Sequence, residues 1–194
     1  MAKAEVQEAL KDIQAYLEEN ADPAHAEGMG VIAPGAKKVY GVRSPEMNAL
    51  LKAIKPGSFE LIDALWKSGI YEMRMLAVKL LEWQSKTDPE RGIATVIRFS
   101  SEIDNWAICD TIGMKSLKKL TKKYPERIFE LSEQFTHSKN MWERRLSMVL
   151  LWELCKDKKW HPRIQKIVDQ HRGDKEKYIK KAVVWLDKTL NDHS

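Results

Sequence analysis

The chain has 194 residues and a formal net charge of +5, with 43% hydrophobic and 31% charged residues. These are ordinary values for one globular domain, which we expect to span residues 1–194. No apolar run reaches the ~20 residues needed to cross a bilayer, which argues against a membrane protein. The first 20 residues follow an acidic amphipathic helix pattern, so we do not expect them to act as a signal peptide. Cys109 and Cys155 lack the spacing of metal ligands or of a redox pair, which favours the cytoplasm.

The N-terminal segment, residues 1–30, is acidic and helical. It carries a net charge of −5, and apolar residues recur at helical spacing over 3–20. An Asp-Pro pair predicts a second, short helix over 23–28. Residues 28–41 contain four glycines and one proline, and we predict a loop there.

Residues from about 45 to 190 show helical periodicity in paired segments, without sustained period-two alternation. The sequence therefore predicts an all-α fold. Its expected helices cover 45–54, 58–68, 71–83, 88–100, 103–113, 115–123, 125–136, 140–155, 161–171 and 174–190.

Four aromatic residues open apolar helical runs, at spacings of 35, 36 and 36 residues. They are Tyr71, Trp106, Trp142 and Tyr178. A fixed period of this size indicates an array of similar units. It lies above the ~34 residues of tetratricopeptide repeats and below the ~40–47 of common HEAT repeats. We therefore predict short HEAT-like helical pairs stacked into a curved α-solenoid.

The fourth residue after each aromatic differs in chemical type between one repeat and the other three. It is apolar in three repeats, as Met75, Leu146 and Ala182, but it is Asp110 in the second. Asp110 shares a helix face with Trp106. A sheltered carboxylate there needs a cationic partner or a chemical role. The alternatives are a structural pair with an arginine of the next repeat and a more exposed register.

Arg145 is the third residue after Trp142, so stacked repeats could bring it to Asp110. It could orient the carboxylate, hold a phosphate, or form only a structural ion pair. Trp185 follows Tyr178 by seven residues on the same face and could stack on bases or cations. Three further tryptophans are predicted to be core residues, namely Trp66, Trp83 and Trp152.

Positive charge is concentrated after residue 30, where the balance is +10. Such a balance favours an anionic partner, most commonly nucleic acid, although each cluster could also be a solvated helix face. The clusters are Lys37 and Lys38; Lys115, Lys118, Lys119, Lys122 and Lys123; Lys156, Lys158 and Lys159; and Lys175, Lys177, Lys180 and Lys181. The sequence has no phosphate-binding glycine loop, zinc-binding histidine pair or nucleophile elbow, so neither a metal nor a cofactor is expected.

Several segments resemble the AlkD-like DNA alkylation repair glycosylases, which are built from HEAT-like repeats. These are AHAEGM (24–29), YGVRSPEMNALLKAI (40–54), YEMRMLAVKLL (71–81), DNWAICDTIG (104–113), MWERRLSMVLL (141–151) and YIKKAVVWLDKTL (178–190). The resemblance implies a monomer that hydrolyses the N-glycosidic bond of positively charged alkylated purines in double-stranded DNA. Such bases include 3-methyladenine and 7-methylguanine, and members of the family need not flip the base into a pocket.

The resemblance also implies roles for particular residues. Trp106, Asp110 and Trp185 would form the catalytic cluster, with DNA contacts from Arg145, Arg144, Lys181, Lys37 and Lys38. Alkylation already makes the base a cationic leaving group, so one carboxylate can suffice to stabilise the oxocarbenium-like sugar.

One segment departs from the family pattern. Ile32 falls near the position of a tyrosine that faces the lesion in the family, which implies narrower or weaker activity, or DNA binding without excision. A non-catalytic protein that binds damaged or branched DNA, and a scaffold for protein partners, are therefore the alternatives.

Overall fold

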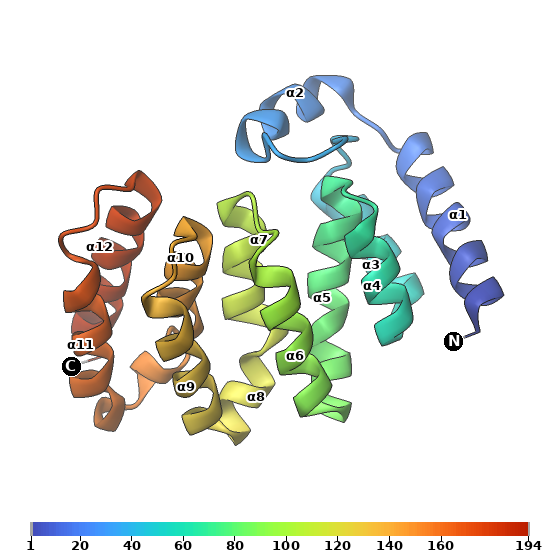
Figure 1. Ribbon diagram of the computed structural model, residues 1–194. Helices are drawn as coiled ribbons and strands as arrows, with labels where there is room; N and C mark the ends of the chain where they lie inside the picture. Colours follow the sequence, from blue (N-terminus) through green and yellow to red (C-terminus); the bar gives the residue numbers. More distant parts are fainter. Residues whose placement is uncertain (1, 194) are drawn as a thin grey trace.

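Residues 2–193 are described by a computed structural model in which successive helices lie side by side (Figure 1). The α-helices are α1 (Lys3–Glu19), α2 (Pro23–Ile32), α3 (Ser44–Ile54), α4 (Phe59–Lys67), α5 (Tyr71–Thr87), α6 (Pro89–Ser100), α7 (Trp106–Thr111), α8 (Lys118–Lys123), α9 (Pro125–Thr136), α10 (Met141–Leu150), α11 (His161–His171) and α12 (Lys177–Asp192). A π-helical turn, η1 (Ile112–Ser116), connects α7 to α8. Two 3₁₀ turns, η2 (Leu154–Lys156) and η3 (Lys158–Trp160), precede α11. The all-α prediction is confirmed, since the described residues contain no strand and only an isolated bridge.

Side-chain caps explain where several of these helices begin. Ser58 accepts a hydrogen bond from the N–H of Leu61 at 3.2 Å, and Asp88 accepts one from Arg91 at 3.0 Å. Each cap satisfies a backbone donor that the first helical turn leaves unpaired. Proline also occupies one of the first two positions of α6, α9 and α11, where its missing N–H costs nothing.

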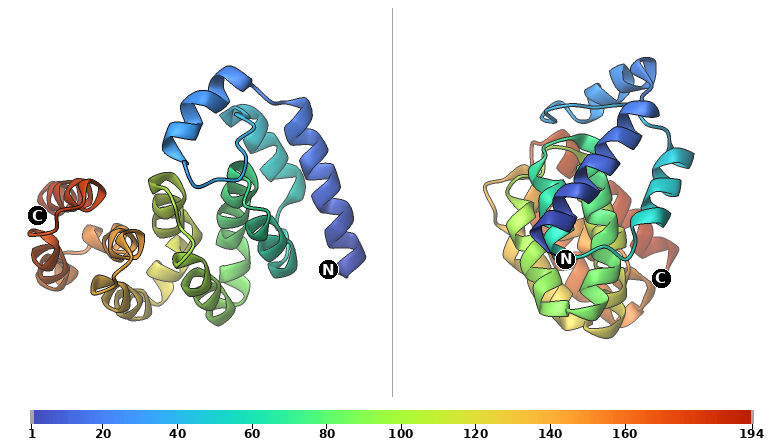
Figure 2. Two further views of the ribbon diagram at one scale, coloured as in Figure 1. Left: turned by 45° about the horizontal axis from the view of Figure 1, so that its top comes forward. Right: turned by 90° about the vertical axis from the view of Figure 1, so that its right-hand side faces the viewer.

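The paired helices form two layers (Figure 2). We call α4, α6, α9 and α11 the outer layer, and α5, α7 with η1, α10 and α12 the inner layer; α2 lies over the inner-layer side. Arginine–carboxylate pairs join neighbouring helices of the outer layer at 2.7–2.8 Å. They are Arg91–Glu60, Arg127–Glu90 and Arg163–Glu126. Each pair links one repeat to the next, so the stacking follows the sequence period.

The hydrophobic core runs along the stack as two adjoining clusters. Trp66 is buried and stacks on Phe99 with ring centroids 4.1 Å apart, as predicted for a core residue. Trp83 and Trp152 are only half-buried. The core prediction is wrong for these two, which lie outside both core clusters; a lysine ammonium group lies 5.9 Å from the centre of the Trp83 ring and 4.6 Å from that of Trp152.

Six predicted boundaries differ from the observed ones by three or more residues. Helix α2 continues to Ile32, so the irregular segment begins at residue 33 and not at 28. Two glycines inside α2 are compatible with this extension, and the helix ends just before Pro34, as expected for a residue preceding proline. Helix α5 is also longer than predicted and ends at Thr87 instead of residue 83. The remaining changes shorten helices: the helices predicted over 103–113 and 115–123 begin at Trp106 and Lys118, α10 ends at Leu150, and α12 begins at Lys177. Among the described residues, no helix is long and apolar enough to span a membrane.

Candidate functional site

The four aromatic residues that define the repeat lie at the start of the inner-layer helices. Each is the first or second residue of α5, α7, α10 or α12. The equivalent positions one turn later are sheltered, as predicted. Leu146 and Ala182 are buried, and Met75 and Asp110 are half-buried. Asp110 is therefore a carboxylate on a surface that the other repeats fill with apolar side chains.

Arg145 from α10 holds this carboxylate with both arms of its guanidinium group. Its Nε donates to Asp110 Oδ1 and its Nη2 to Oδ2, each at 2.8 Å. The third nitrogen, Nη1, donates to the carbonyl oxygen of Tyr178 in α12 at 2.7 Å. Such a bidentate pair has a fixed geometry. The expectation that stacking brings Arg145 to Asp110 is confirmed, and the pair also forms the inter-repeat contact that was its structural alternative.

The pair is sheltered unevenly. The Arg145 side chain is 10% exposed, whereas that of Asp110 is 23% exposed. Burial lowers the pKa of Arg145, but the hydrogen bonds and charge of Asp110 outweigh it and leave the pKa raised above its usual value. Arg145 therefore remains cationic, and it presents the carboxylate towards the more open side.

A close helix contact explains how α10 comes near enough. Gly113 lies in the π-turn η1, and a Cβ atom there would stand 2.6 Å from Val149 Cγ1. Only a glycine permits this approach between η1 and α10. The Asp110 and Arg145 side chains lie one turn earlier on each of the two contacting segments, so the glycine contact sets their distance.

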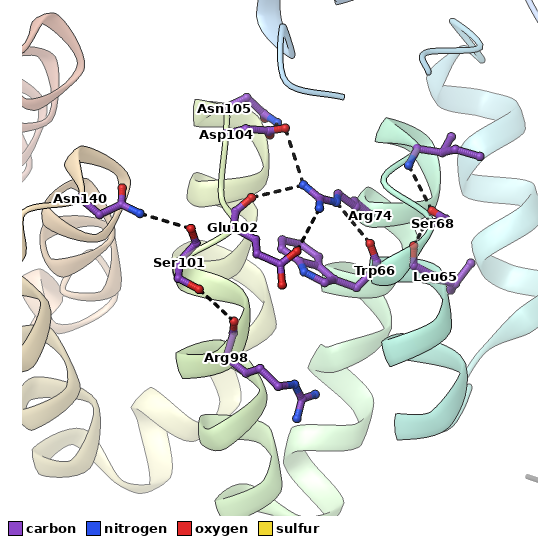
Figure 3. A network of polar contacts seen from close by, with 11 residues as sticks. Leu65, Trp66, Ser68, Arg74, Arg98, Ser101, Glu102, Asp104, Asn105 and Asn140 are labelled. Carbon is purple, nitrogen blue, oxygen red and sulfur yellow. Dashed lines mark hydrogen bonds and ion pairs between the residues drawn. The ribbon is translucent and has the colours of Figure 1, made fainter. Parts of the chain in front are cut away.

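Trp106 is the most exposed of the four aromatic openers, at 39%. The preceding loop fixes its position, because the buried Asn105 side chain caps α7 by accepting from the N–H of Ile108 at 3.0 Å. Asn105 also donates to Asp104 Oδ1 at 2.6 Å. Arg74 in α5 anchors the same loop from the neighbouring repeat (Figure 3). The sequence does not predict this support for Trp106.

Arg74 makes four polar contacts that tie α4, α5 and the loop together. Its donors reach the carbonyl oxygens of Trp66 and Glu102, at 3.3 and 3.2 Å, and the Glu102 carboxylate at 3.2 Å. A weaker ion pair reaches Asp104 at 3.6 Å. The guanidinium carbon also lies 4.7 Å from the centre of the Trp66 ring. Arg74 is the third residue after its aromatic opener, as Arg145 is in its own repeat, and this shared position could have signalled its role.

The aromatic surface beyond the ion pair comes from α10 and α12. The Trp142 and Tyr178 rings are 5.0 Å apart and tilted by 38°. Trp185 lies two turns after Tyr178 and is partly buried against the C-terminal core cluster. Lys181 is exposed on the same helix. Tyr178 contacts Arg145 directly through its carbonyl group, whereas the predicted roles of Trp185 and Lys181 remain proposals.

Arg144 is engaged in the structure. Its Nε donates to the Asp174 carboxylate at 2.8 Å, and Nη1 donates to the carbonyl oxygens of Ser138 and Lys139 at 3.0 and 3.1 Å. Its Nη2 atom alone is free of these protein contacts. Arg144 therefore fastens the α9–α10 turn to the loop before α12, and a DNA contact through this residue stays a proposal.

Lys37 and Lys38 lie in the segment that follows α2. The Lys37 N–H donates to the Gly69 carbonyl at 2.9 Å, and Lys38 Nζ lies 4.0 Å from the centre of the Tyr40 ring. Both side chains are exposed. Ile32, the last residue of α2, is half-buried, while Val31 is 80% exposed.

Glu72, which sequence reasoning missed, holds this segment against α5. Its buried carboxylate accepts from the N–H of Tyr40 at 3.1 Å and of Gly41 at 2.8 Å. Gly41 has a positive φ of 76°, which favours glycine at this turn. An acidic residue directly after the aromatic opener Tyr71 could have predicted this contact, because a carboxylate buried beside the core requires hydrogen-bond donors.

The arrangement can stabilise positive charge at a surface. It combines a carboxylate of fixed orientation, an exposed indole and an arginine, contributed by consecutive repeats. Among the described residues, no three His, Cys, Asp or Glu side chains gather as metal ligands. The carboxylate with its aromatic neighbour can attract a cationic group through charge and through the negative face of the ring.

Comparison with known proteins agrees with this architecture. The family model described as "DNA alkylation repair enzyme" matches residues 13–192. A solved structure, described as a predicted DNA alkylation repair enzyme from Enterococcus faecalis, is similar in fold with a TM-score of 0.77. The two chains are 19% identical, and the match covers 90% of this chain and 84% of the other. No curated protein matches the chain in sequence.

Proposed function

The chain belongs to the family of DNA alkylation repair enzymes, and we propose that it is a DNA glycosylase that releases positively charged alkylated purines. The role in DNA alkylation repair follows from the family. The observation that supports glycosylase chemistry is the Asp110 carboxylate, held by Arg145 and partly exposed beside Trp106. The substrates proposed are 3-methyladenine and 7-methylguanine in double-stranded DNA.

The chemistry suits a single carboxylate. Alkylation at N3 or N7 gives the purine a positive charge, so it can leave as a neutral base without protonation. The sugar then acquires positive charge, which Asp110 would stabilise or use to position the attacking water. Two unit charges about 4 Å apart interact by about 4 kcal/mol at an effective dielectric constant of ~20, which corresponds to about a thousandfold in rate. This is the upper limit, because the charge of Arg145 offsets part of that of Asp110.

The neighbouring residues would contact the base and sugar, orient the carboxylate and bind the DNA backbone. Trp106 would place its exposed ring against the cationic base or sugar, and Trp185 would do so from α12. Arg145 would keep the carboxylate oriented and, at the edge of the pair, contact a backbone phosphate. Arg144, Lys181, Lys37 and Lys38 would contribute further DNA contacts. The protein would act as a monomer and without a cofactor.

The decisive experiment measures free base released from methylated duplex DNA by chromatography and mass spectrometry. We expect release by the unmodified protein and a loss of up to about a thousandfold in Asp110→Asn, with DNA affinity equal or higher. Asp187→Asn is the matched control, because Asp187 also forms a bidentate pair, with Arg172, at 2.7 and 2.9 Å. Equal loss in both variants would point to stability and not to chemistry.

Binding without excision is the second candidate function. Two observations favour it: both oxygens of Asp110 already accept from Arg145, and Ile32 stands near the position where an aromatic residue was expected. Unmodified protein that binds methylated duplex but releases no base would establish this candidate. Phosphate contacts predict an affinity that falls steeply with salt. Absence of DNA binding at low salt would instead indicate a scaffold for protein partners.

A further inference from the structure

Helix α5 contacts the next repeat through three side-chain pairs along one face. In the first pair, Thr111 Oγ1 lies 3.5 Å from Met75 Sδ, and in the third, Lys119 Nζ lies 3.4 Å from the Glu82 carboxylate. The middle pair is formed by two lysines: Lys79 and Lys115 each lie four residues after a member of the first pair, and the charge of Lys115 acts on Lys79. In order along α5, the pairs are Met75–Thr111, Lys79–Lys115 and Glu82–Lys119. The first pair is neutral and the third joins opposite charges, whereas the middle pair places two positive charges side by side.

The backbone around the middle pair is fixed by hydrogen bonds. Ser116 Oγ donates to the carbonyl oxygen of Val78 at 2.5 Å, and Ser85 Oγ donates to the carbonyl oxygen of Ser116 at 2.9 Å. Val78 precedes Lys79 and Ser116 follows Lys115, so these bonds set the position of both lysines. Lys115 also belongs to the π-turn η1, a rare conformation that often accompanies functional sites.

The two lysines are held together without a carboxylate. Within residues 2–193, neither forms an ion pair, whereas Lys119 and Lys122 in the following helix each pair with a glutamate. Lys79 is half-buried, and burial together with the charge of Lys115 lowers its pKa. Adjacent like charges destabilise the free protein. A shared anion would relieve this repulsion.

We propose that Lys79 and Lys115 together bind one phosphate of the DNA backbone close to Asp110. The proposal rests on the proposed function: Trp106, Asp110 and Arg145 belong to inner-layer helices, so DNA that contacts them would lie along this layer. Lys79 is one turn, about 5.4 Å, along α5 from Met75, and Met75 contacts Thr111, the neighbour of Asp110. A DNA strand carries one phosphate per ~3.4 Å of helix axis, so a phosphate lies within this reach of a sugar at Asp110.

Equilibrium binding of an undamaged duplex, followed by fluorescence anisotropy at several salt concentrations, tests the pair without requiring catalysis. We expect Lys79→Met and Lys115→Gln each to weaken binding about tenfold, as for loss of a charge-assisted hydrogen bond. The slope of log K against log salt should become shallower by about 1. Because both lysines hold the same phosphate, the double variant should bind about as weakly as either single variant.

Two further measurements separate a binding role from a structural one. Thermal unfolding of the free protein should show Lys115→Gln to be as stable as the unmodified protein, or more stable, because the repulsion is removed. Lys79→Arg keeps the charge and should retain most of the affinity. Lys166→Gln removes an exposed lysine from the outer-layer helix α11 and should leave binding unchanged.

The proposal is overturned if both lysine variants bind DNA with unchanged affinity and salt slope. A second outcome also overturns it: inorganic phosphate raises the thermal stability of the unmodified protein but not of the lysine variants, while the DNA affinity of the variants is unchanged. The pair would then bind free anions and not the DNA backbone. Loss of base release in either variant is not needed for these conclusions. A failed glycosylase assay would therefore leave the test of the phosphate site intact.

Discussion

Gly113 and Val149 lie so close together that a Cβ atom on Gly113 would stand 2.6 Å from Val149 Cγ1 and 2.8 Å from the Val149 carbonyl carbon. The second of these atoms is backbone, so a larger side chain cannot be accommodated by a rotamer change. The contact joins the π-turn after Asp110 to the helix that carries Arg145. The spacing of the ion pair therefore depends on the absence of one side chain.

Gly113→Ala should push η1 and α10 apart. We expect a loss of about 1–3 kcal/mol in the free energy of unfolding, as for other overpacked sites, and a fall in base release as Arg145 moves from Asp110. Urea denaturation and the base-release assay measure the two effects. Gly173→Ala is the matched control, since a Cβ atom there would have no neighbour within 4 Å. Equal stability of both variants would show that η1 can adjust without cost.

Glu72→Gln should loosen the segment after α2. The substitution removes the charge from the oxygen that accepts from both Tyr40 and Gly41, and it places an amide donor at the position of Oε2, which accepts from the N–H of Tyr40 at 3.1 Å. Hydrogen bonds to a charged group contribute about 1.5–3 kcal/mol, so we expect a loss of that order. Hydrogen exchange should increase at residues 38–43 before other regions. Glu82→Gln, on the same helix but half-exposed, is the control. Unchanged exchange in Glu72→Gln would contradict the anchoring role.

The two cysteine thiols should resist alkylating reagents in the folded protein. Burial raises the pKa of Cys155 to about 12, and burial followed by the charge of Asp110 raises that of Cys109 well above its usual value. At pH 8 a thiol with a pKa of about 12 is ionised in about one molecule in ten thousand, and the thiolate is the reactive form. Iodoacetamide should therefore label both residues only after denaturation. Rapid labelling of the native protein would indicate local opening of α7 or η2.

Stability should fall on mild acidification because of His171. Its ring is buried, 3.2 Å from Ser147 Oγ, and burial lowers its pKa below the ordinary 6.5; Asp174 opposes this shift, whereas Arg144 and His137 add to it. The unfolded chain therefore binds a proton at a higher pH than the folded protein does. The stability contribution is complete above pH 6.5 and is lost as the pH falls from 6.5 through the lowered value.

Urea titrations between pH 7.5 and 5 check this dependence. The unmodified protein should lose stability as the pH falls, and His171→Gln should show a shallower dependence. His193→Gln, at an exposed position, should follow the unmodified protein. Parallel curves for all three proteins would assign the pH dependence to other groups.

The repeat period made most of the fold predictable. Regular spacing of the aromatic openers placed the inner helices in register, and that register brought Arg145 to Asp110. The repeat period does not predict the π-turn at Ile112–Ser116. A π-turn widens the helix only locally, so the apolar residues on either side of it still follow helical spacing. Nor does the period predict the full length of α2, since Gly28 and Gly30 indicate a loop by composition although nothing crowds them in the helix.

The supporting contacts of the site were less predictable than the pair itself. Lys79 and Lys115 are 36 residues apart, and their proximity depends on how two helices rotate against each other. Lys115 appeared in the sequence only as part of a basic cluster. The position of Arg74, like that of Arg145, follows from the repeat, but its partners come from a loop whose path the sequence does not specify.

The contacts around Arg145 have a consequence for how the chain can change. Asp110, Arg145 and the Tyr178 carbonyl belong to three consecutive helical units, and no unit holds more than one of them. Duplication of one unit would therefore not produce a second complete site, and deletion of one unit would remove a member of the existing one. Bending of the stack would change the length of these hydrogen bonds, since they connect neighbouring units. The distance between the Arg145 guanidinium and the Asp110 carboxylate therefore depends on the curvature of the stack. A change in this distance when DNA binds would show how far the protein bends around the duplex.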